Sequence, residues 1–517
     1  MTHLNLAKSE TTRLLAILAV IIFISFFLGL GNAPLFDVDE GAFSEATREM
    51  IASKNYLTTY LNGIPRFDKP VLIYWLQLVC VRLFGQSEFS FRLPSALAGT
   101  VWATSIFLFV RKKASNNKQA FLAAALMVLS LQVTVIAKAA IADALLNCFL
   151  AITLFAVLRH YETGTKSALH LAFAAAGFGM LTKGPIAVII PVAVFFIFAL
   201  LEKDIKKWFK TVFSPTGILL FLCIALPWYL LEYRDQGMPF IEGFFFKHNV
   251  NRFNTSFEGH SGSLLYYFPV IMIGLMPYTG LLFTVLFNLK KLLPDRENRF
   301  LIIWFCFVFI FFSLSGTKLP HYLIYGYTPL FILMARSLPI SKHPERLTLW
   351  PLFLLALLAF LPFFVQIAMS YTSDAYILAL LQGAIELMGR KHLFVMMTTL
   401  IVIMAIQFMP KLSAGNKLIA TGMVFALLIN IYLMPIAGKL LQEPVKEAAL
   451  KAKKERYKIV MWKVYNPSFL VYSNSFVERR APRKGEIVLT TVKQLDALDK
   501  PAILYSKYGI VMAKLMQ

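Results

Sequence analysis

Runs of about 20 apolar residues recur along this chain of 517 residues, and they constrain its fold more than any other feature. A helix of about 20 residues can cross a bilayer with its backbone polar groups satisfied internally. Hydrophobic residues make up 58% of the chain and charged residues 15%, whereas a soluble protein carries about 25% charged residues. The sequence therefore predicts an α-helical polytopic membrane protein.

Thirteen apolar segments qualify as membrane spans in this prediction. Their approximate ranges are 12–31, 92–111, 118–136, 141–158, 167–181, 184–201, 212–231, 264–288, 298–315, 319–338, 347–369, 392–410 and 416–434. The first segment resembles a signal peptide, but it is long and its small-residue site is followed by Pro34. We therefore expect an uncleaved first transmembrane helix.

The formal net charge of +23 does not indicate nucleic-acid binding, because the excess Lys and Arg lie mostly in short loops between apolar segments. Such a distribution is the positive-inside pattern of membrane proteins. It predicts a cytoplasmic N-terminus. It also predicts that the loops at 32–91, 232–263 and 370–391 and a tail from 435 lie on the outer side.

Two outer regions have structure of their own in this interpretation. The loop at 32–91 contains two apolar or amphipathic segments, 40–53 and 70–85, that we expect to be surface helices of a transmembrane domain spanning 1–434. Residues 435–517 alternate charged and strand-like segments and predict a small α/β cap domain. Its expected strands are at 459–462, 469–472, 486–489 and 502–505, with a short helix at 491–498.

Ionisable residues on the expected outer side form the candidate site, because charges at a membrane boundary are costly and often functional. They come from at least six separate segments. The candidates are Asp39, Glu40, Asp68, Lys69, Lys138, Asp143, Lys183, His248, Arg252, His260, Lys318 and His321.

Each candidate also has an ordinary structural explanation, which stays open at this level. Asp39 and Glu40 would suit a helix N-terminus, and Lys69 would suit the membrane interface. The lysines of two similar turns, Lys183 and Lys318, would suit any polar loop. Lys138 and Asp143 could pair with each other, and His248 and His321 could be hydrogen-bonded loop residues.

Several cations and two carboxylates beside a membrane suit a lipid-linked phosphate. Lys69, Lys183, Arg252 and Lys318 would bind the phosphate and stabilise charge as it leaves. A carboxylate would orient or deprotonate the incoming nucleophile. The helices would hold the lipid tail.

Three motifs carry a family resemblance. They are Asp39-Glu40 with Phe67-Asp68-Lys69-Pro70, then Leu181-Thr182-Lys183-Gly184-Pro185, and then Lys318-Leu319-Pro320-His321-Tyr322. With Phe244–Phe253, they resemble the protein O-mannosyltransferase-like branch of the C-type glycosyltransferases, and within it the bacterial lipid A 4-amino-4-deoxy-L-arabinose transferases. The likeness covers about residues 12–340.

The resemblance implies the C-type glycosyltransferase fold and transfer of a sugar, aminoarabinose-like or a hexose, from a polyprenyl-phosphate carrier such as undecaprenyl phosphate. It implies lipid A or another envelope acceptor at the periplasmic face of the bacterial inner membrane. It puts Asp39 and Glu40 at the reaction centre and Lys69 near the donor phosphate. Lys138, Asp143, His321 and Tyr322 are further site candidates. A divalent metal such as zinc, between Asp68 and His248, is also implied.

The chain departs from that pattern at two places. Ala42-Phe43 stands where aminoarabinose transferases usually carry Arg-Tyr, and Asp68 replaces a glutamate. The missing arginine should weaken the hold on a phosphate, so a different sugar or a different acceptor stays open. A protein O-mannosyltransferase-type enzyme, with a protein hydroxyl as the acceptor, is one alternative. A polyprenyl-lipid transporter is the other alternative, although its midplane charges and matched halves are not evident.

Overall fold

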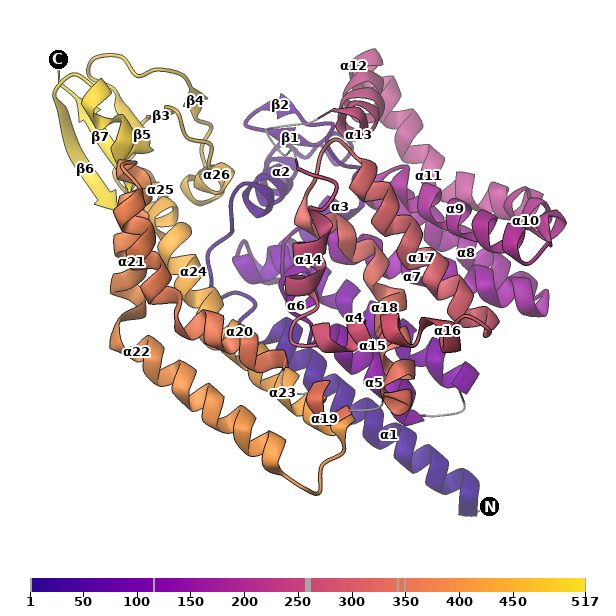
Figure 1. Ribbon diagram of the computed structural model, residues 1–517. Coiled ribbons are helices and arrows are strands. Elements are labelled where there is room, and N and C mark those ends of the chain that lie inside the picture. Colours follow the sequence, from indigo (N-terminus) through magenta and orange to yellow (C-terminus); the bar gives the residue numbers. More distant parts are fainter. Residues whose placement is uncertain (1, 115–116, 256–261, 342–343, 348–349, 517) are drawn as a thin grey trace.

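The computed structural model describes residues 2–114, 117–255, 262–341, 344–347 and 350–516. Helices dominate it, and a small sheet lies at the C-terminal end of the chain (Figure 1). The predicted helical membrane fold with a small C-terminal α/β region is confirmed.

Eight helices among the described residues are long and apolar enough to cross a membrane, or ten if two bent pairs each form one span. Five of the eight spans lie in single helices: α4 (Glu88–Ala114), α7 (Asp143–Thr163), α11 (Pro215–Gln236), α17 (Arg296–Leu314) and α22 (Ala375–Phe408). The other three combine consecutive helical elements. Glu10–Phe27 lies within α1 (Thr2–Ile22) and η1 (Phe23–Phe27); Pro320–Ile340 comprises η3 (Pro320–Gly326), α18 (Tyr327–Ser337) and η4 (Leu338–Ile340); and Ala414–Leu441 comprises α23 (Ala414–Leu428), η5 (Ile429–Leu433) and α24 (Met434–Leu441). The bent pairs are α14 (Tyr267–Gly274) with α15 (Thr279–Phe287), at 115°, and α20 (Trp350–Ala359) with α21 (Leu361–Tyr371), at 49°. The chain is a multi-pass membrane protein.

Two of these expected spans fold as shorter or broken helices. Residues 118–136 form α5 (Asn117–Val128) and α6 (Leu131–Ile136), and residues 184–201 form the shorter α9 (Ile186–Leu201), whereas the span expected at 167–181 lies within the continuous helix α8 (Lys166–Lys183). The second half of α5, from Ala123 to Val128, is fully buried. It is therefore covered by other helices and not by lipid, which its apolar sequence alone does not distinguish.

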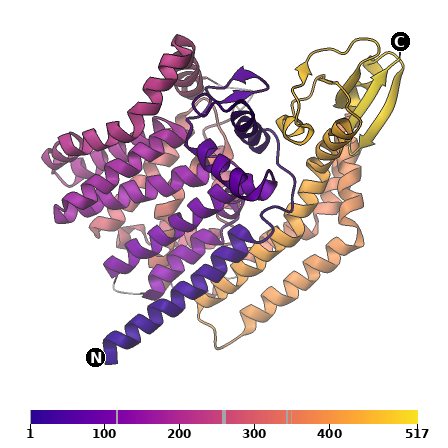
Figure 2. The same ribbon diagram turned by 180° about the vertical axis from the view of Figure 1, so that it is seen from behind.

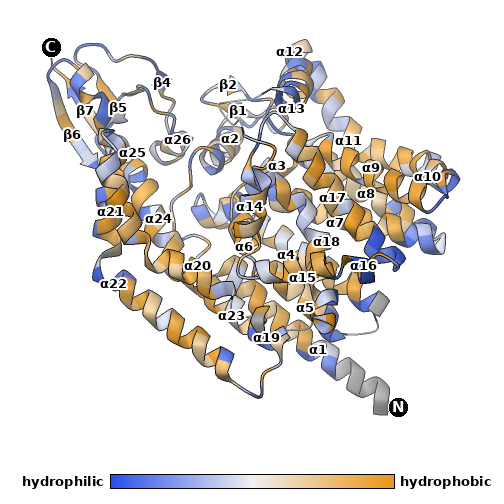
Figure 3. Ribbon diagram, viewed as in Figure 1, coloured by the Kyte–Doolittle hydropathy of each residue, from blue (hydrophilic) through white to orange (hydrophobic). Residues whose placement is uncertain are grey.

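Most helices are hydrophobic along their length, and polar residues gather at the ends of the molecule (Figure 3). One polar end contains the basic elements α10 (Ile205–Val212) and α16 (Leu289–Leu292), and α19 (Pro344–Leu347) lies in another basic connection. The opposite end contains the hairpin of β1 (Tyr60–Leu61) and β2 (Ile64–Pro65), together with α2 (Asp39–Ser53), α12 (Met238–Ile241), η2 (Glu242–Asn251) and α13 (Arg252–Asn254) (Figures 1 and 2). We call this opposite end the site end. The segment 370–391, expected as a loop there, is largely the start of α22, which bends at Gly389.

The C-terminal region is a mixed sheet with two helices. Its strand order is β4-β3-β5-β7-β6, with β3 parallel to both β4 and β5, and β7 antiparallel to both β5 and β6. The strands are β3 (Ile459–Met461), β4 (Glu478–Arg479), β5 (Ile487–Thr491), β6 (Pro501–Lys507) and β7 (Ile510–Leu515), with the 3-10 helix η6 at Val492–Ala497. Helix α25 (Glu443–Lys454) precedes the sheet.

The strand expected at 469–472 is wrong, because these residues belong to helix α26 (Pro467–Ser473). Pro467 occupies its first turn, where a missing N–H does no harm. Asn474 ends it in the left-handed conformation. The carboxylate of Asp37 accepts hydrogen bonds from the Ser468 N–H (2.8 Å) and hydroxyl (2.5 Å), so a long-range contact stabilises the helix start.

Helix α2 does not lie on the membrane as expected, because the C-terminal region covers it. Its residues from Glu40 to Met50 are all buried between α3 (Leu72–Phe84) and α26. Further links join this loop to the tail: Arg48 donates to Asn474 (2.8 Å), and Asn62 donates to the Val477 carbonyl (2.7 Å). The first loop and the tail therefore form one packed unit at the site end.

A buried ion pair anchors α2 to the helical bundle. Arg92 of α4 binds both carboxylate oxygens of Glu40, at 2.8 and 2.7 Å. The same guanidinium donates to the carbonyls of Leu30, Ala33 and Pro34, which lie between α1 and α2. Glu40 also accepts the Ala140 N–H at 2.7 Å. One pair thus joins three separate parts of the chain.

We expect Arg92→Ala to lower the free energy of unfolding by about 3–5 kcal/mol, because it leaves a buried carboxylate without its partner. Arg82→Ala is the control. Arg82 is exposed and donates to the Tyr56 hydroxyl (2.9 Å), so its loss should change stability by about 0.5 kcal/mol or less. Denaturation of both variants in detergent makes the comparison, and equal stabilities would contradict the anchoring role.

Candidate functional site

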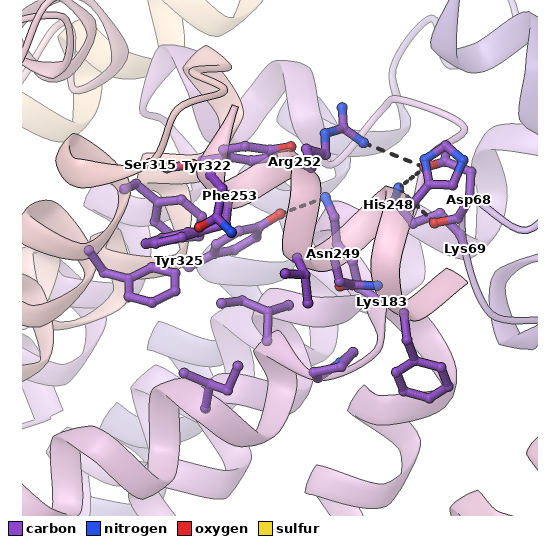
Figure 4. Close-up of a pocket in the computed structure, with 18 residues that line it drawn as sticks. Asp68, Lys69, Lys183, His248, Asn249, Arg252, Phe253, Ser315, Tyr322 and Tyr325 are labelled. Atoms are coloured by element: carbon purple, nitrogen blue, oxygen red, sulfur yellow. Dashed lines mark hydrogen bonds and ion pairs between the residues drawn. The ribbon is translucent and has the colours of Figure 1, made fainter. Parts of the chain in front are cut away.

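Four cationic or imidazole side chains converge on the carboxylate of Asp68. Asp68 lies between β2 and α3, and Lys69 Nζ is 2.6 Å from its Oδ1, while Arg66 Nη2 is 3.0 Å from its Oδ2. His248 of η2 places Nδ1 at 3.3 Å from Oδ1, and Arg252 of α13 places Nη1 at 3.5 Å from the same oxygen. The close-up shows Asp68 with Lys69, His248 and Arg252 at one side of a pocket (Figure 4). Residues about 180 positions apart therefore form one charged cluster.

The cluster has an excess of positive charge around one acid. Burial by itself would raise the pKa of Asp68, but Lys69, His248 and Arg66 together hold that pKa well below its ordinary value. Burial lowers the pKa of Lys69 to about 8, with Arg252 and Lys183 adding to the decrease and Asp68 opposing it. A further anion beside Lys69 would relieve this repulsion. The electrostatics therefore favour an anionic ligand here.

A second cluster lies on neighbouring helix ends. Lys183, the last residue of α8, donates to Asp143 Oδ1 (2.7 Å) and to the Tyr325 hydroxyl (2.6 Å), and Tyr325 donates in turn to Asp143 Oδ1 (2.6 Å). His321 Nε2 is 4.0 Å from the same carboxylate oxygen. The Lys183 ammonium also lies 5.7 Å from the ring centre of Tyr322. Asp143 thus orients one lysine and one phenol.

Gly184 makes the turn that presents Lys183. Its φ of +80° is a conformation that only glycine adopts without strain, and a Cβ there would lie 2.6 Å from the ring of Phe244. The helix therefore ends at Lys183, with Phe244 of η2 packed against the turn.

Two cavities meet at the Asp68 cluster. The inner cavity has a volume of about 400 Å³, and the outer cavity about 1100 Å³. The inner cavity is lined mainly by apolar and aromatic side chains, with polar groups from both clusters: Lys69, Lys183, Asn249, Tyr322 and Tyr325. Asp68, His248 and Arg252 line both cavities and form their shared wall.

The outer cavity opens between the first loop, η2 and the C-terminal sheet. Asp39, the first residue of α2, is exposed in it, and His321 also lines it. Its cationic lining is richer than its acidic lining. The cations are Arg66, Lys247, Arg252 and Arg479, against the acids Asp39 and Asp68.

The structure brings together most of the predicted site residues but separates three of them. Glu40 is buried against Arg92 and lines neither cavity. Lys138 donates to the Leu28 carbonyl and to Asn430 (2.8 Å), and it does not pair with Asp143. Lys318 donates to the Ser315 carbonyl (2.6 Å) and lines neither cavity. His260 lies outside the described residues.

Two contributors, Tyr325 and Arg479, were not anticipated from the sequence, and a third, Arg66, belongs to a charged motif that marks a site but had no role assigned to it. Tyr325, three residues after Tyr322, was detectable only by its helical spacing. Arg479 comes from the C-terminal tail, and no local motif indicates it. Its guanidinium carbon lies 4.1 Å from the ring centre of Tyr465. Arg66 lies beside the recognised motif, and its guanidinium is 5.0 Å from the ring centre of Phe43. An arginine from another segment therefore lies next to the position where the expected arginine is missing.

The metal expectation has two of its ligands in place. Asp68 and His248 are adjacent, but among the described residues no group of three His, Cys, Asp or Glu side chains could hold a metal. A catalytic zinc takes three protein ligands, and Asp68 is already compensated by Lys69 and Arg66. These residues do not complete a zinc site, so we derive no step through a metal, and the metal stays a prediction.

Comparisons with known proteins agree with this architecture. Residues 68–230 match the family described as dolichyl-phosphate-mannose-protein mannosyltransferase. An undecaprenyl phosphate-α-4-amino-4-deoxy-L-arabinose arabinosyl transferase of Proteus mirabilis is 30% identical over 66% of this chain, and the match spans 62% of that relative. An uncharacterized protein of Aquifex aeolicus is 31% identical over 62% of this chain and 72% of its own length. The crystal structure of ArnT from Cupriavidus metallidurans bound to undecaprenyl phosphate shares the fold, with a TM-score of 0.82, 18% identity and 98% of each chain covered.

We expect sulfate to bind this cluster more tightly at pH 7 than at pH 9. The pKa of Lys69 is about 8, so its ammonium is largely lost between these values, and the affinity should fall by about tenfold with the charged fraction. Sulfate itself keeps its charge over this range. Sulfate-dependent protection against thermal unfolding measures the effect. The control Lys69→Arg should bind equally at both pH values, whereas a pH-independent wild type would contradict the assignment.

Proposed function

Because this chain belongs to the protein O-mannosyltransferase-like family of membrane proteins, we propose that it is a glycosyltransferase. It transfers one sugar from a polyprenyl-phosphate carrier to lipid A or another envelope acceptor. The sugar is of the aminoarabinose type, as in the name of the Proteus mirabilis relative. The reaction takes place at the periplasmic face of a bacterial inner membrane.

The shared wall of the two cavities carries this proposal. Arg252 of this wall and Lys69 beside it hold the donor phosphate, the apolar inner cavity holds the first part of the polyprenyl chain, and the sugar projects into the outer cavity. The bond between the anomeric carbon and the phosphate oxygen breaks while the acceptor oxygen bonds to that carbon. The polyprenyl phosphate leaves with the bonding electrons, and Lys69 and Arg252 stabilise its added charge.

The outer cavity favours an anionic acceptor. Arg66, Lys247 and Arg479 surround the space beyond the donor phosphate, and arginine suits phosphate recognition because its guanidinium binds two oxygens at once. A lipid A phosphate is already anionic and needs no strong base. Asp39 then contacts the sugar or positions the acceptor. If a protein hydroxyl were the acceptor, Asp39 would have to remove its proton.

The function is tested by mass spectrometry of envelope glycolipids from cells with and without this protein, followed by transfer with purified protein and a polyprenyl-phosphate sugar. A lipid A species heavier by one sugar, present only with the protein, is the expected result. Unchanged glycolipids together with a glycosylated protein would identify the hydroxyl acceptor instead.

Alanine variants of the four proposed phosphate-binding cations should differ in how far their kcat/KM falls. A charge-assisted hydrogen bond contributes about 1.5–3 kcal/mol, so Lys69→Ala should lower kcat/KM by roughly tenfold to a few hundredfold. Arg252→Ala, in the shared wall, should behave similarly. Lys183→Ala should also lower kcat, because it disrupts Asp143 and Tyr325.

Lys318→Ala is the informative contrast in this series, since Lys318 lines neither cavity. We expect its effect on kcat/KM of folded protein to be the smallest of the four. Steady-state kinetics with a polyprenyl-phosphate sugar decide the order. Changes of less than twofold in all four variants would remove the phosphate-binding role.

We expect Asp39→Asn to abolish transfer while the protein stays folded, because it keeps the size of the side chain and removes its charge from the outer cavity. Asp37→Asn is the matched control. Asp37 accepts hydrogen bonds from Ser468 and Asn466, so its substitution should lower thermal stability but leave the activity of the folded fraction largely intact. Full activity of Asp39→Asn in a purified assay would overturn its role.

The proposed periplasmic placement predicts a fixed topology. Reporter tags at residues 205 and 295 should report the cytoplasm, and tags at 60 and 480 should report the outer side, because basic connections stay in the cytoplasm. The pair at 60 and 480 should agree with each other in any case, since the first loop and the tail pack together. A cytoplasmic signal at 480 would place the site on the wrong face.

A further inference from the structure

A third cavity, of about 300 Å³, lies among α7, α8, α9, α10 and α11 and shares no lining residue with the inner and outer cavities. Its lining is apolar except for two hydroxyls. Its lining includes Thr153, Val157, Ala176, Val192, Thr211 and Leu222. Leu222 is 39% exposed on the membrane-facing surface of α11, so the cavity wall reaches the lipid.

The two hydroxyls of this cavity are unsatisfied. Thr153 and Thr211 are each 3% exposed, and neither Oγ1 has a hydrogen-bond partner. Other threonines of α7 and α8 behave differently: Thr163 donates to the Arg159 carbonyl (2.8 Å), and Thr182 donates to the Phe178 carbonyl (2.7 Å). Buried polar groups in proteins are normally paired. Two unpaired donors in one apolar cavity therefore point to a ligand that carries acceptor oxygens.

Helix α10 forms one wall of the cavity and is amphipathic, with one side toward the cavity and the other side exposed. Thr211 and Val212 line the cavity, and the indole of Trp208 donates to the Val192 carbonyl of α9 (3.2 Å), which fixes the inward side. Lys206 and Lys210, one turn apart, are exposed on the other side.

The same helix carries the marks of a membrane interface. Phe209 and Phe213 are 52% and 59% exposed, and their rings stack with centres 5.9 Å apart. Exposed aromatic residues beside lysines are typical of helices at the boundary between lipid and water. The cavity therefore lies beneath a cationic surface at the end of the molecule that carries α16, away from the site end (Figure 3).

We infer that this third cavity binds an anionic phospholipid. One acyl chain fills the apolar space, and ester carbonyl oxygens accept hydrogen bonds from Thr153 and Thr211. The headgroup leaves the cavity past the edge of α10, so that Lys206 and Lys210 on the outer side of that helix bind its phosphate. This assignment explains the three observations together. An apolar cavity alone would suit any hydrocarbon, but the two hydroxyls without partners need acceptors, and two exposed lysines at a membrane surface favour an anionic headgroup.

A polyprenyl phosphate fits the same cavity less well, because its chain has no ester carbonyls. The phospholipid site is independent of the proposed transferase site and does not depend on it. It marks a lipid contact on the opposite side of the membrane.

Native mass spectrometry of the purified chain tests the assignment with three matched lipids: diester phosphatidylglycerol, its diether analogue and diester phosphatidylcholine. We expect the diester anionic lipid to bind about tenfold more tightly than either of the others. The diether analogue loses one or two hydrogen bonds to the threonines, and phosphatidylcholine loses one charge contact with the lysines. The Thr153→Val/Thr211→Val double variant should bind diester and diether lipids equally. The Lys206→Ala/Lys210→Ala variant should bind the anionic and zwitterionic lipids equally.

Two controls separate this site from general lipid adhesion. Thr163→Val removes a hydroxyl that is already paired, and Lys290→Ala/Lys291→Ala removes two exposed lysines on α16. Both variants should keep the wild-type preference for diester over diether lipid and for the anionic over the zwitterionic headgroup. Equal wild-type binding of diester and diether lipid, equal binding of the two headgroups, tighter binding of a polyprenyl monophosphate, or no retained lipid would each overturn the inference.

Discussion

The ion pair between Glu40 and Arg92 determines which of two adjacent carboxylates is exposed in the outer cavity. Both side chains are buried, and Arg92 binds Glu40 and three carbonyls of the segment before α2 at once. The backbone around Glu40 therefore has one orientation relative to the bundle. Asp39, its neighbour in sequence, is then exposed in the outer cavity. Of two adjacent carboxylates, one holds the structure and the other is left for a ligand.

The charges of the site end suit a ligand that is itself an anion. In the free protein, Asp68 serves as the counter-ion for Lys69, Arg66 and Arg252. This arrangement keeps the cations close together without a phosphate. Burial, with Arg252 and Lys183 adding to it, still lowers the pKa of Lys69 although Asp68 opposes the decrease. An incoming phosphate meets donors that are already oriented. Such preorganised charge is effective because little rearrangement is needed when negative charge develops on the leaving group.

Much of this arrangement could be predicted from the sequence because the signals were strong and local. The apolar runs identify a helical membrane protein, and the short motifs identify Asp39, Lys69 and Lys183. The division of roles could not be predicted. Nothing local distinguishes Glu40 from Asp39, since their difference comes from Arg92, which is 52 residues away. Lys183 and Lys318 follow similar turn patterns, yet in the described part of the chain Lys183 lines the inner cavity and Lys318 lines neither the inner nor the outer cavity.

The errors in secondary structure have the same origin. Phe469–Tyr472 has the composition of a strand, but Asp37 stabilises the start of a helix there through the Ser468 N–H. Helix α2 is amphipathic enough for a membrane surface, but the tail covers it. In both cases a contact between the first loop and the tail outweighs local preference. Such contacts are visible only when the chain is folded.

The central claim is that the shared wall of the two cavities holds the phosphate of a polyprenyl carrier. An experimental structure of this protein with a bound polyprenyl monophosphate tests the claim most directly. The account predicts phosphate oxygens within about 3 Å of Lys69 Nζ and the Arg252 guanidinium, with the isoprenoid chain in the inner cavity. A phosphate bound instead among Arg479, Lys247 and the tail, with the inner cavity empty of the chain, would contradict it.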